Sequence, residues 1–168
     1  MANLVTKRLR MVSWNQELVL AAMEDKSRLS QILGLEVPHD FPSDSVRKFV
    51  LPMTLEELER DPSIGQWSGM IVHVSDAILI GTMGFKSSPD EFGNVEMGYD
   101  IIPKYQGQGY ATEMARALIE WAFRQPSVDC VTAKCLVTNI PSVRVLEKVG
   151  MNKVSQVEDM IYWKIDKR

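Results

Sequence analysis

The sequence has few of the residues that bind metals or form disulfide bonds. Its 168 residues include two histidines and two cysteines, Cys130 and Cys135, which are five residues apart in one strand-like run. At that spacing the two thiols point to opposite faces of a strand and cannot pair there. Together with His39 and His73 they match no known spacing of metal ligands, so we expect no bound metal. Unpaired cysteines fit a reducing compartment, and we expect a cytoplasmic protein.

Long apolar runs and a strong net charge are also absent. No stretch approaches the roughly 20 apolar residues that span a bilayer, and residues 1–10 lack the apolar core of a signal peptide. The 19 basic and 22 acidic residues give a net charge of -3, and the basic ones are scattered. Such a distribution argues against a protein that neutralises nucleic-acid phosphates. We therefore expect no nucleic-acid partner and no membrane attachment.

Length and composition predict one domain over residues 1–168, because this is the size of a typical single domain. The composition, 45% hydrophobic and 24% charged, is that of an ordinary globular chain. A chain of this length buries roughly 70% of its unfolded surface and needs no disulfide bond. Both a monomer and a homodimer are compatible with these properties.

Hydrophobic periodicity predicts helices first, then an antiparallel meander, then alternating strands and helices. The expected strands are 4–12, 67–74, 77–85, 94–102, 130–137 and two within 152–165. The expected helices are 13–33, divided near 25–27, then 43–61, 109–124 and 139–149. Capping-box patterns begin at Ser13 and Thr54, and Pro52 should interrupt the second helical region. This order predicts a mixed α/β (α+β) layout around one sheet.

The most informative stretch is QGQGYA at residues 106–111, which follows a predicted strand and opens a helix. Small residues let a ligand approach the backbone, and the free N–H groups and dipole of a helix start attract phosphate. A nucleotide-hydrolase P-loop is excluded because Tyr110 stands where that motif needs lysine. A dinucleotide fingerprint fails because Thr112 replaces its third small residue and Asp129 precedes a strand instead of ending one. Alone, the motif fits either phosphate binding or an ordinary strand-to-helix turn.

Two segments extend this motif, VEMGYDIIPKYQGQGYATEMARALIEWA at 95–122 and NIPSVRVLEKVGM at 139–151. They resemble the GNAT superfamily of acetyl-CoA-dependent N-acetyltransferases, whose signature Q/R-x-x-G-x-G/A is matched by Gln106, Gly109 and Ala111. The resemblance extends over nearly the whole chain and is greatest to the branch of ribosomal-protein alanine N-acetyltransferases. It implies a single mixed, mostly antiparallel sheet with a bulged, splayed central strand and helices on both faces.

The resemblance also implies acetyl-CoA as co-substrate and a set of residues that would hold it. In the family the pantetheine arm lies beside the splayed strand, bound by backbone groups as an added strand would be. The Gly-rich turn would cradle the pyrophosphate, and an asparagine would cap the next helix and contact pantetheine or the acceptor. The implied cofactor-binding residues are Ile101, Ile102, Gln106, Gly107, Gln108, Gly109, Tyr110, Ala111, Asn139 and Ser142.

For the chemistry, the resemblance implies direct attack of a primary amine, on a protein N-terminus or a small molecule, on the thioester. Deprotonation at pH 7 costs about 4 kcal/mol for a lysine side chain and about 1 kcal/mol for an α-amine. Glu96 matches the general base that family members use. Leu146 stands where many members have a proton-donating tyrosine, so Ser142, one turn earlier, is the expected proton donor.

Less specific interpretations of the same residues stay open. Glu96 could be a solvated strand residue, and Ser142 an ordinary polar residue at a helix start. The replacement at Leu146 favours a second class of function, a non-catalytic acyl-CoA-binding sensor or regulatory module. A binding module would not need the carboxylate of Glu96, which favours the enzyme. The acceptor should be shaped by the helical region 15–61 and by Tyr162.

Overall fold

The structure is a computed structural model that describes residues 4–168, and Met1, Ala2 and Asn3 lie outside the described residues. Within the described range, the strands of one seven-stranded sheet are β1 (Leu9–Ser13), β2 (Ser68–His73), β3 (Ile78–Phe85), β4 (Asn94–Ile101), β5 (Cys130–Leu136), β6 (Asn152–Val157) and β7 (Met160–Asp166). Their order across the sheet is β1-β2-β3-β4-β5-β7-β6. All neighbours are antiparallel except β4 and β5, which are parallel. The predicted mixed, mostly antiparallel sheet is therefore confirmed.

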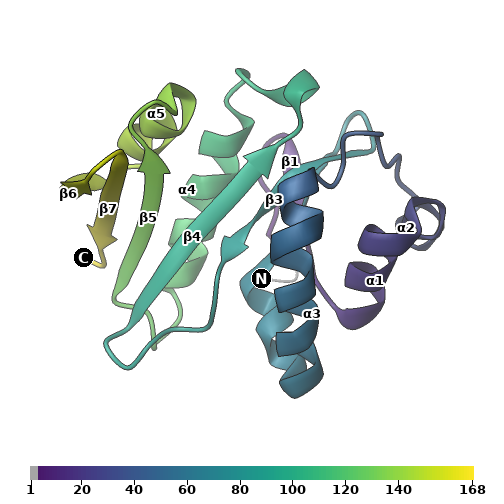
Figure 1. Cartoon of the computed structure of the whole chain (residues 1–168), viewed down its shortest axis with the longest axis horizontal. Helices are drawn as coiled ribbons and strands as arrows, with labels where there is room; N and C mark the ends of the chain where they lie inside the picture. The colour runs from purple at the N-terminus through teal and green to yellow at the C-terminus, as the bar shows by residue number, and fades with distance from the viewer. Residues whose placement is uncertain (1–3) are drawn as a thin grey trace.

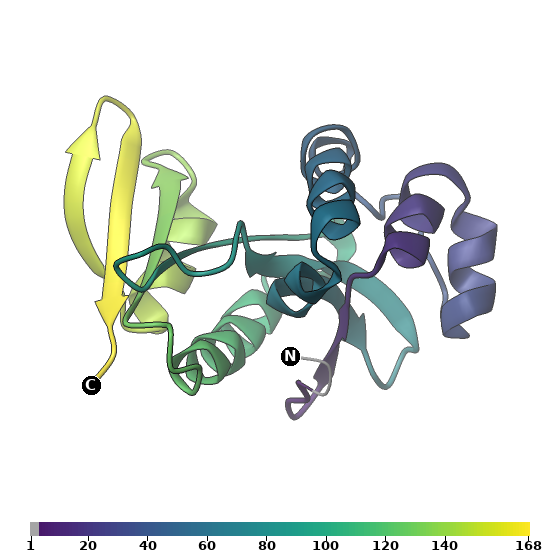
Figure 2. The ribbon, with the colours of Figure 1, turned by 90° about the horizontal axis from the view of Figure 1, so that it is seen from below.

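The helices cover both faces of this sheet, as Figures 1 and 2 show. They are α1 (Gln16–Glu24), α2 (Lys26–Leu33), the π-helical turn η1 (Val46–Val50), α3 (Leu51–Arg60), the 3-10 helices η2 (Pro62–Trp67) and η3 (Pro103–Tyr105), α4 (Tyr110–Phe123) and α5 (Ile140–Lys148). The helices α1, α2 and α3 lie on one face, and α4 lies on the other with α5 packed against it. In the part of the chain that is described, no helix is long and apolar enough to cross a membrane.

Single capping residues set the ends of the first two helices. Asn15 caps α1 by accepting a hydrogen bond from the N–H of Leu18 (2.8 Å). The cap predicted at Ser13 is wrong, because Ser13 is the last residue of β1. Asp25 divides the helical region as predicted, since its carboxylate caps α2. Gly34, with a left-handed φ of 66°, ends α2.

The second helical region runs through its proline without a break. The π-helical turn passes directly into α3, and Pro52 is the second residue of α3, where the wider π-helical turn ends. Thr54 is already inside the helix and its hydroxyl donates to the carbonyl of Val50 (2.9 Å). The predicted interruption at Pro52 and the predicted cap at Thr54 are therefore wrong.

The core lies on both faces of the central strands. Every residue of β3 is buried, as expected for a strand covered by helices on both sides. The rings of Trp67 and Trp121 meet edge to face at 5.1 Å, joining the end of η2 to α4. In β5, Cys130 and Cys135 are buried free thiols, which agrees with the prediction that they do not pair.

The sheet opens between β4 and β5. Their parallel pairing joins Asn94–Glu96 to Cys130–Thr132, and beyond Glu96 the two strands separate. The predicted splay of the central strands is therefore present. Over the described pairing, β3 and β4 keep one register from Gly81 opposite Ile101 to Phe85 opposite Met97. The prediction of a bulge in β4 is thus wrong for this pairing. A register shift lies instead between β2 and β3.

Candidate active site

The unpaired edge of β4 faces the gap where this strand leaves β5. In an antiparallel pair, alternate residues exchange backbone hydrogen bonds with the neighbouring strand. Ile102 belongs to the bonded set, because its N–H donates to Ile80 of β3 (2.8 Å). Tyr99 and Ile101 belong to the other set, so their N–H and C=O groups point toward the gap. The C=O of Ile101 accepts a hydrogen bond from Gln106 Nε2 (2.7 Å), which leaves its N–H to face the gap, whereas the N–H of Ile102 is already bonded within the sheet.

A cleft of about 800 Å³ opens at this gap, between β4, the Gly-rich turn and α5. Its lining includes eight of the ten predicted cofactor-binding residues, namely Ile101, Gln106, Gly107, Gly109, Tyr110, Ala111, Asn139 and Ser142. The other two, Ile102 and Gln108, are not part of the lining. Two cations of α5, Arg144 and Lys148, also line the cleft. The cleft thus combines free backbone groups, a helix start and positive charge.

The Gly-rich turn exposes backbone toward this cleft. Gly107 and Gly109 have φ values of 73° and 84°, in the left-handed region that favours glycine. A Cβ at Gly107 would meet nothing within 4 Å, so the turn leaves open space beside its backbone. Gly109 precedes the first residue of α4, and no side chain in residues 4–168 caps this helix. Its first N–H groups are therefore free to bind an anion, as the chemistry of a CoA pyrophosphate requires.

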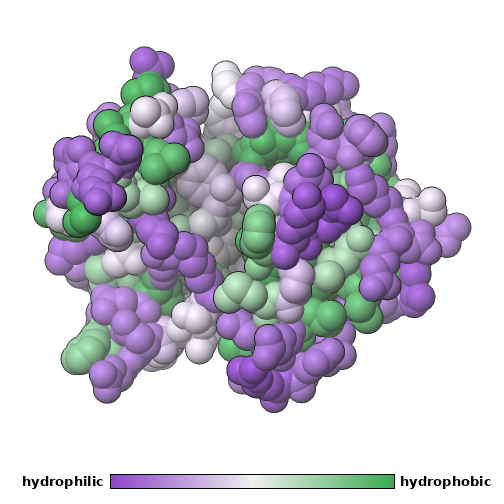
Figure 3. Space-filling model, viewed as in Figure 1, coloured by the Kyte–Doolittle hydropathy of each residue, from purple (hydrophilic) through white to green (hydrophobic). Residues whose placement is uncertain are grey.

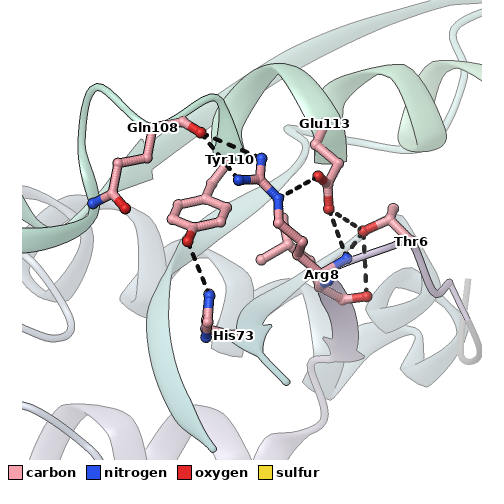
Figure 4. Close-up of polar contacts among 7 residues, drawn as sticks. Thr6, Arg8, His73, Gln108, Tyr110 and Glu113 are labelled. Atoms are coloured by element: carbon pink, nitrogen blue, oxygen red, sulfur yellow. Dashed lines mark hydrogen bonds and ion pairs between the residues drawn. The ribbon is translucent and has the colours of Figure 1, made fainter. Parts of the chain in front are cut away.

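Arg8 holds the Gly-rich turn from the opposite side (Figure 4). Its two terminal nitrogens each lie 3.3 Å from the carbonyl oxygen of Gln108, and its guanidinium lies 4.3 Å from the centre of the Tyr110 ring. Its Nε donates to Glu113 Oε1 (2.8 Å), while Glu113 Oε2 accepts from the Thr6 hydroxyl (2.6 Å). Burial acts to raise the pKa of Glu113, but the hydrogen bonds from Thr6 and Arg8 outweigh it and lower this pKa. The segment before β1 is thus tied to the first turn of α4.

The side chain of Tyr110 anchors the turn to β2 (Figure 4). Its hydroxyl lies 2.9 Å from Nε2 of buried His73. The N–H of Asp76 donates to Nδ1 of His73 (3.2 Å), and Asp76 Oδ2 lies 3.3 Å from the same nitrogen. Tyr105 in turn donates to Asp76 (2.7 Å), and this bond to a carboxylate raises the pKa of Tyr105 to about 12. The turn therefore rests on a continuous chain of hydrogen bonds.

Ser142 and Tyr99 meet across the cleft from α5 and β4. Asn139 caps α5 as predicted, since its side chain accepts from the N–H of Ser142 (3.3 Å). The Ser142 hydroxyl lies 2.8 Å from the Tyr99 hydroxyl. Burial raises the pKa of Tyr99 against the lowering effect of this hydrogen bond, so its phenol keeps its proton near neutral pH. Leu146, one turn after Ser142, is buried and supplies no polar group.

Glu96 lies on the face of β4 that α4 does not cover. Val95 and Met97 are buried on the α4 side, so the side chain between them points to the opposite face. Figure 3 shows that this side of the molecule is hollowed between the part that carries α3 and the part that carries α5. Glu96 Oε2 forms an ion pair with Lys86 Nζ, and their side chains are 31% and 51% exposed. The predicted general base thus lies partly exposed on the face of β4 opposite α4, paired with a cation.

Sequence reasoning missed Arg8, Lys86 and the hydroxyl of Tyr99. Arg8 belongs to the opening Thr-Lys-Arg-Leu-Arg strand, where it looks like an exposed edge residue. Tyr99 alternates with the polar residues of its strand and looks like a core residue, although its hydroxyl reaches the cleft. The position of Lys86 opposite Glu96 follows from the observed register of β3 and β4, which the sequence pattern does not contain. No group of three or more His, Cys, Asp or Glu side chains among the described residues could hold a metal ion.

Comparisons with known proteins agree with this arrangement. A family model described as "Acetyltransferase (GNAT) domain" matches residues 8–152. The uncharacterized N-acetyltransferase YjdG of Bacillus subtilis (strain 168) is 30% identical over 166 residues, which cover 96% of this chain and 98% of that protein. The ribosomal-protein-S5-alanine acetyltransferase of Vibrio fischeri aligns with a TM-score of 0.67 at 18% identity, over 98% of this chain and 96% of that one. RimL, a ribosomal L7/L12 α-N-protein acetyltransferase solved in complex with coenzyme A, aligns with a TM-score of 0.68 at 17% identity over 96% of each chain.

Proposed function

The chain belongs to the GNAT acetyltransferase family, and from this premise we propose that it transfers acetyl from acetyl-CoA to a primary amine with Glu96 as general base. Membership makes it an N-acetyltransferase, an enzyme that acetylates an amine. The finer assignments are the acceptor class and the role of each residue. One observation carries them, the position of Glu96 on the same open strand that borders the donor cleft.

The cleft fits coenzyme A through groups that the chain itself provides. We assign the pyrophosphate to the free N–H groups at the start of α4 and to the open backbone of Gly107. Arg144 and Lys148 would add positive charge beside it. The pantetheine amides would bond to the N–H and C=O groups of Tyr99 and to the N–H of Ile101 as an added strand does. Bound there, acetyl-CoA supplies the activated acetyl group.

Glu96 would receive the proton that the acceptor amine loses on attack. A carboxylate within reach of the attacking nitrogen, directly or through one water, contributes typically 100-fold or more to such a step. Its side chain is 31% exposed on the face of β4 opposite α4, which gives an acceptor access from solvent. The donor cleft lies along the same strand three residues later, at Tyr99. Acceptor and donor would therefore meet at the gap between β4 and β5.

Ser142 would return a proton to the departing thiolate, with Tyr99 as its hydrogen-bond partner. The thiolate of CoA resembles that of cysteine, with a pKa near 8.5, so this donor assists but is not essential. Because burial raises the pKa of Tyr99, its phenol keeps its proton near neutral pH and can pass one to Ser142. This pair would replace the tyrosine that is missing at Leu146.

Further parts of the proposal concern the organisation and surroundings of the protein. All described elements pack on one sheet, which supports one N-acetyltransferase domain over residues 1–168. Two buried free thiols are consistent with a cytoplasmic protein. The solved protein acetyltransferases with this fold make a protein N-terminus one candidate acceptor and leave small amines as another. We propose no metal, because the donor set of the site suits acyl transfer by general base catalysis.

The test is release of CoA thiol from acetyl-CoA in the presence of an amine panel of peptides, polyamines and aminoglycosides. We expect many equivalents of thiol per chain with at least one acceptor. The alternative, a non-catalytic acyl-CoA-binding sensor, is favoured by the missing tyrosine at Leu146. It predicts that acetyl-CoA raises the melting temperature while no amine in the panel gives turnover.

A further inference from the structure

Within residues 4–168, Lys86 is the amine that forms an ion pair with the proposed catalytic base. It follows β3 directly, and its backbone N–H donates to the carbonyl of Glu96 (2.9 Å), which places the two residues opposite one another across the strands. Their side chains share one face, where Lys86 Nζ forms an ion pair with Glu96 Oε2. Both are partly exposed, at 51% and 31%. Residues directly opposite in an antiparallel pair stay within side-chain reach, so the pairing follows from the register of the sheet.

The side chain of Lys86 also leans along β4 toward the donor cleft. Gly98 is the next residue of β4 on the face that carries Glu96. A Cβ at Gly98 would have Lys86 Cε as its nearest neighbour, at 3.8 Å. The stem of Lys86 therefore lies over the bare backbone of Gly98, beside the cleft-lining Tyr99 in sequence, while its Nζ ends at Glu96. Glycine at position 98 leaves the space in which this side chain lies.

We propose that Lys86 is an internal acceptor that the enzyme acetylates on its own chain, a modification site that rests on the proposed function. The Glu96 carboxylate takes one proton from the Lys86 ammonium. The Nζ lone pair then forms a C–N bond with the thioester carbonyl carbon of acetyl-CoA, and the C–S bond breaks. The CoA sulfur leaves with its electron pair and takes the second proton from nitrogen. The products are Nε-acetyl-lysine, CoA thiol and the proton held by Glu96.

This modification would change the surroundings of Glu96. Acetylation removes the charge of Lys86, so the ion pair with Glu96 is lost. The carboxylate is then free to accept a proton from an external amine. The chain has one lysine in this position, so the reaction stops after one acetyl group per molecule. An acetylated chain should therefore bind a cationic acceptor beside Glu96 more tightly than an unmodified one.

The test is mass spectrometry of the full-length protein incubated with acetyl-CoA and no other amine. Wild type, K86R, E96Q and E96D are compared with K153R. Lys153 is a matched control, because it is an exposed strand lysine whose Nζ bonds to an amide oxygen of Gln156 (2.8 Å) instead of a carboxylate. We expect one acetyl group on Lys86 in wild type and K153R, at a rate independent of protein concentration. We expect none at this site in K86R, and a rate at least tenfold lower in E96Q and E96D.

Purified wild type can already carry an acetyl group on Lys86. If E96Q prepared in the same way lacks it, this outcome also supports the proposal. Melting curves establish that each variant is folded, and E96D serves if E96Q is not. The proposal is overturned if Lys86 stays unmodified in a protein that releases CoA thiol to external amines, and the proposed function then stands. It is also overturned if Lys86 is modified equally fast in E96Q, or no faster than Lys153, since that is chemical acetylation. Absence of both thiol release and modification contradicts the proposed function together with this inference.

Discussion

The guanidinium of Arg8 lies 4.3 Å from the centre of the Tyr110 ring, so a residue near the start of the chain packs directly on the Gly-rich turn. The same guanidinium binds the carbonyl of Gln108 and the carboxylate of Glu113. A turn held in this way does not need to be ordered when a ligand binds, which lowers the entropic cost of binding.

Replacing Arg8 should therefore weaken donor binding more than it slows the chemical step. For R8M we expect the Kd of CoA, measured by calorimetry, to rise about tenfold, equivalent to about 1.4 kcal/mol. Lysine keeps the charge but lacks the planar fork, so R8K should recover part of the loss. The control is R28M, because Arg28 pairs with Glu17 on an exposed helix surface (3.2 Å). An unchanged Kd in R8M would show that the turn is ordered without Arg8.

Glu113 should make the stability of the fold depend on pH. Its pKa is lowered in the folded protein, so its contribution is present above the unfolded value near 4.5 and is lost as pH falls through the folded value. We expect E113Q to be less stable than wild type by about 1–2 kcal/mol at pH 7. Urea unfolding at several pH values should show this difference shrinking below about pH 4.5. A difference that is constant from pH 7 to pH 3 would exclude this role.

Glu96 should affect turnover without affecting donor binding. We expect E96Q to lower kcat about 100-fold near neutral pH, because no carboxylate accepts the amine proton. The difference in kcat between wild type and E96Q should become smaller above the pKa of the acceptor amine, because the amine is then already deprotonated in solution. Steady-state kinetics across pH, with the Kd of CoA as a second readout, measure both effects. E120Q is the control, since Glu120 lies on the exposed surface of α4, and equal kcat in E96Q and E120Q would remove Glu96 as the base.

Tyr99 and Ser142 should behave as one unit. Each hydroxyl is the partner of the other at 2.8 Å, so removing either one breaks the same proton path. We expect Y99F and S142A each to lower kcat about tenfold, a modest loss because the leaving thiol has a pKa near 8.5. The double variant should lose little more, and a double-mutant cycle in kcat measures this coupling. Losses that multiply in the double variant would mean that the two hydroxyls act independently.

The predictable parts of the fold were those set by residues close in sequence. Asp25 and Gly34 end their helices through bonds within one turn, so their effect does not depend on the rest of the chain. The choice between Ser13 and Asn15 was different, because both are good capping residues. It is decided by the pairing of Ser13 with Gly69, a contact between distant strands that local pattern does not contain.

The candidate site divides in the same way. The Gly-rich turn and the capped start of α5 could be predicted, because each is a local motif with a local reason. The hydrogen-bond pattern of β4 could not be predicted. Which residues of β4, such as Ile102, bond to β3 is decided by the register of the two strands, and this register is seen only in the structure. The pairing of Lys86 with Glu96 depends on that register too. Arg8 reaches the turn because the segment before β1 passes beside α4, which only the tertiary fold shows.

The gap between β4 and β5 also bears on how the molecule avoids aggregation. An exposed strand edge offers unpaired N–H and C=O groups to any other chain and is a common route to unwanted strand addition. Here the free edge of β4 lies in the interior of the sheet, with β5 beyond it and α4 and α5 on one face. A neighbouring strand needs almost 5 Å of clear space along its length, with room for side chains on both faces. A slender, flexible ligand meets that requirement far more easily than a polypeptide does, so the fold can keep a reactive edge open without exposing it to other proteins.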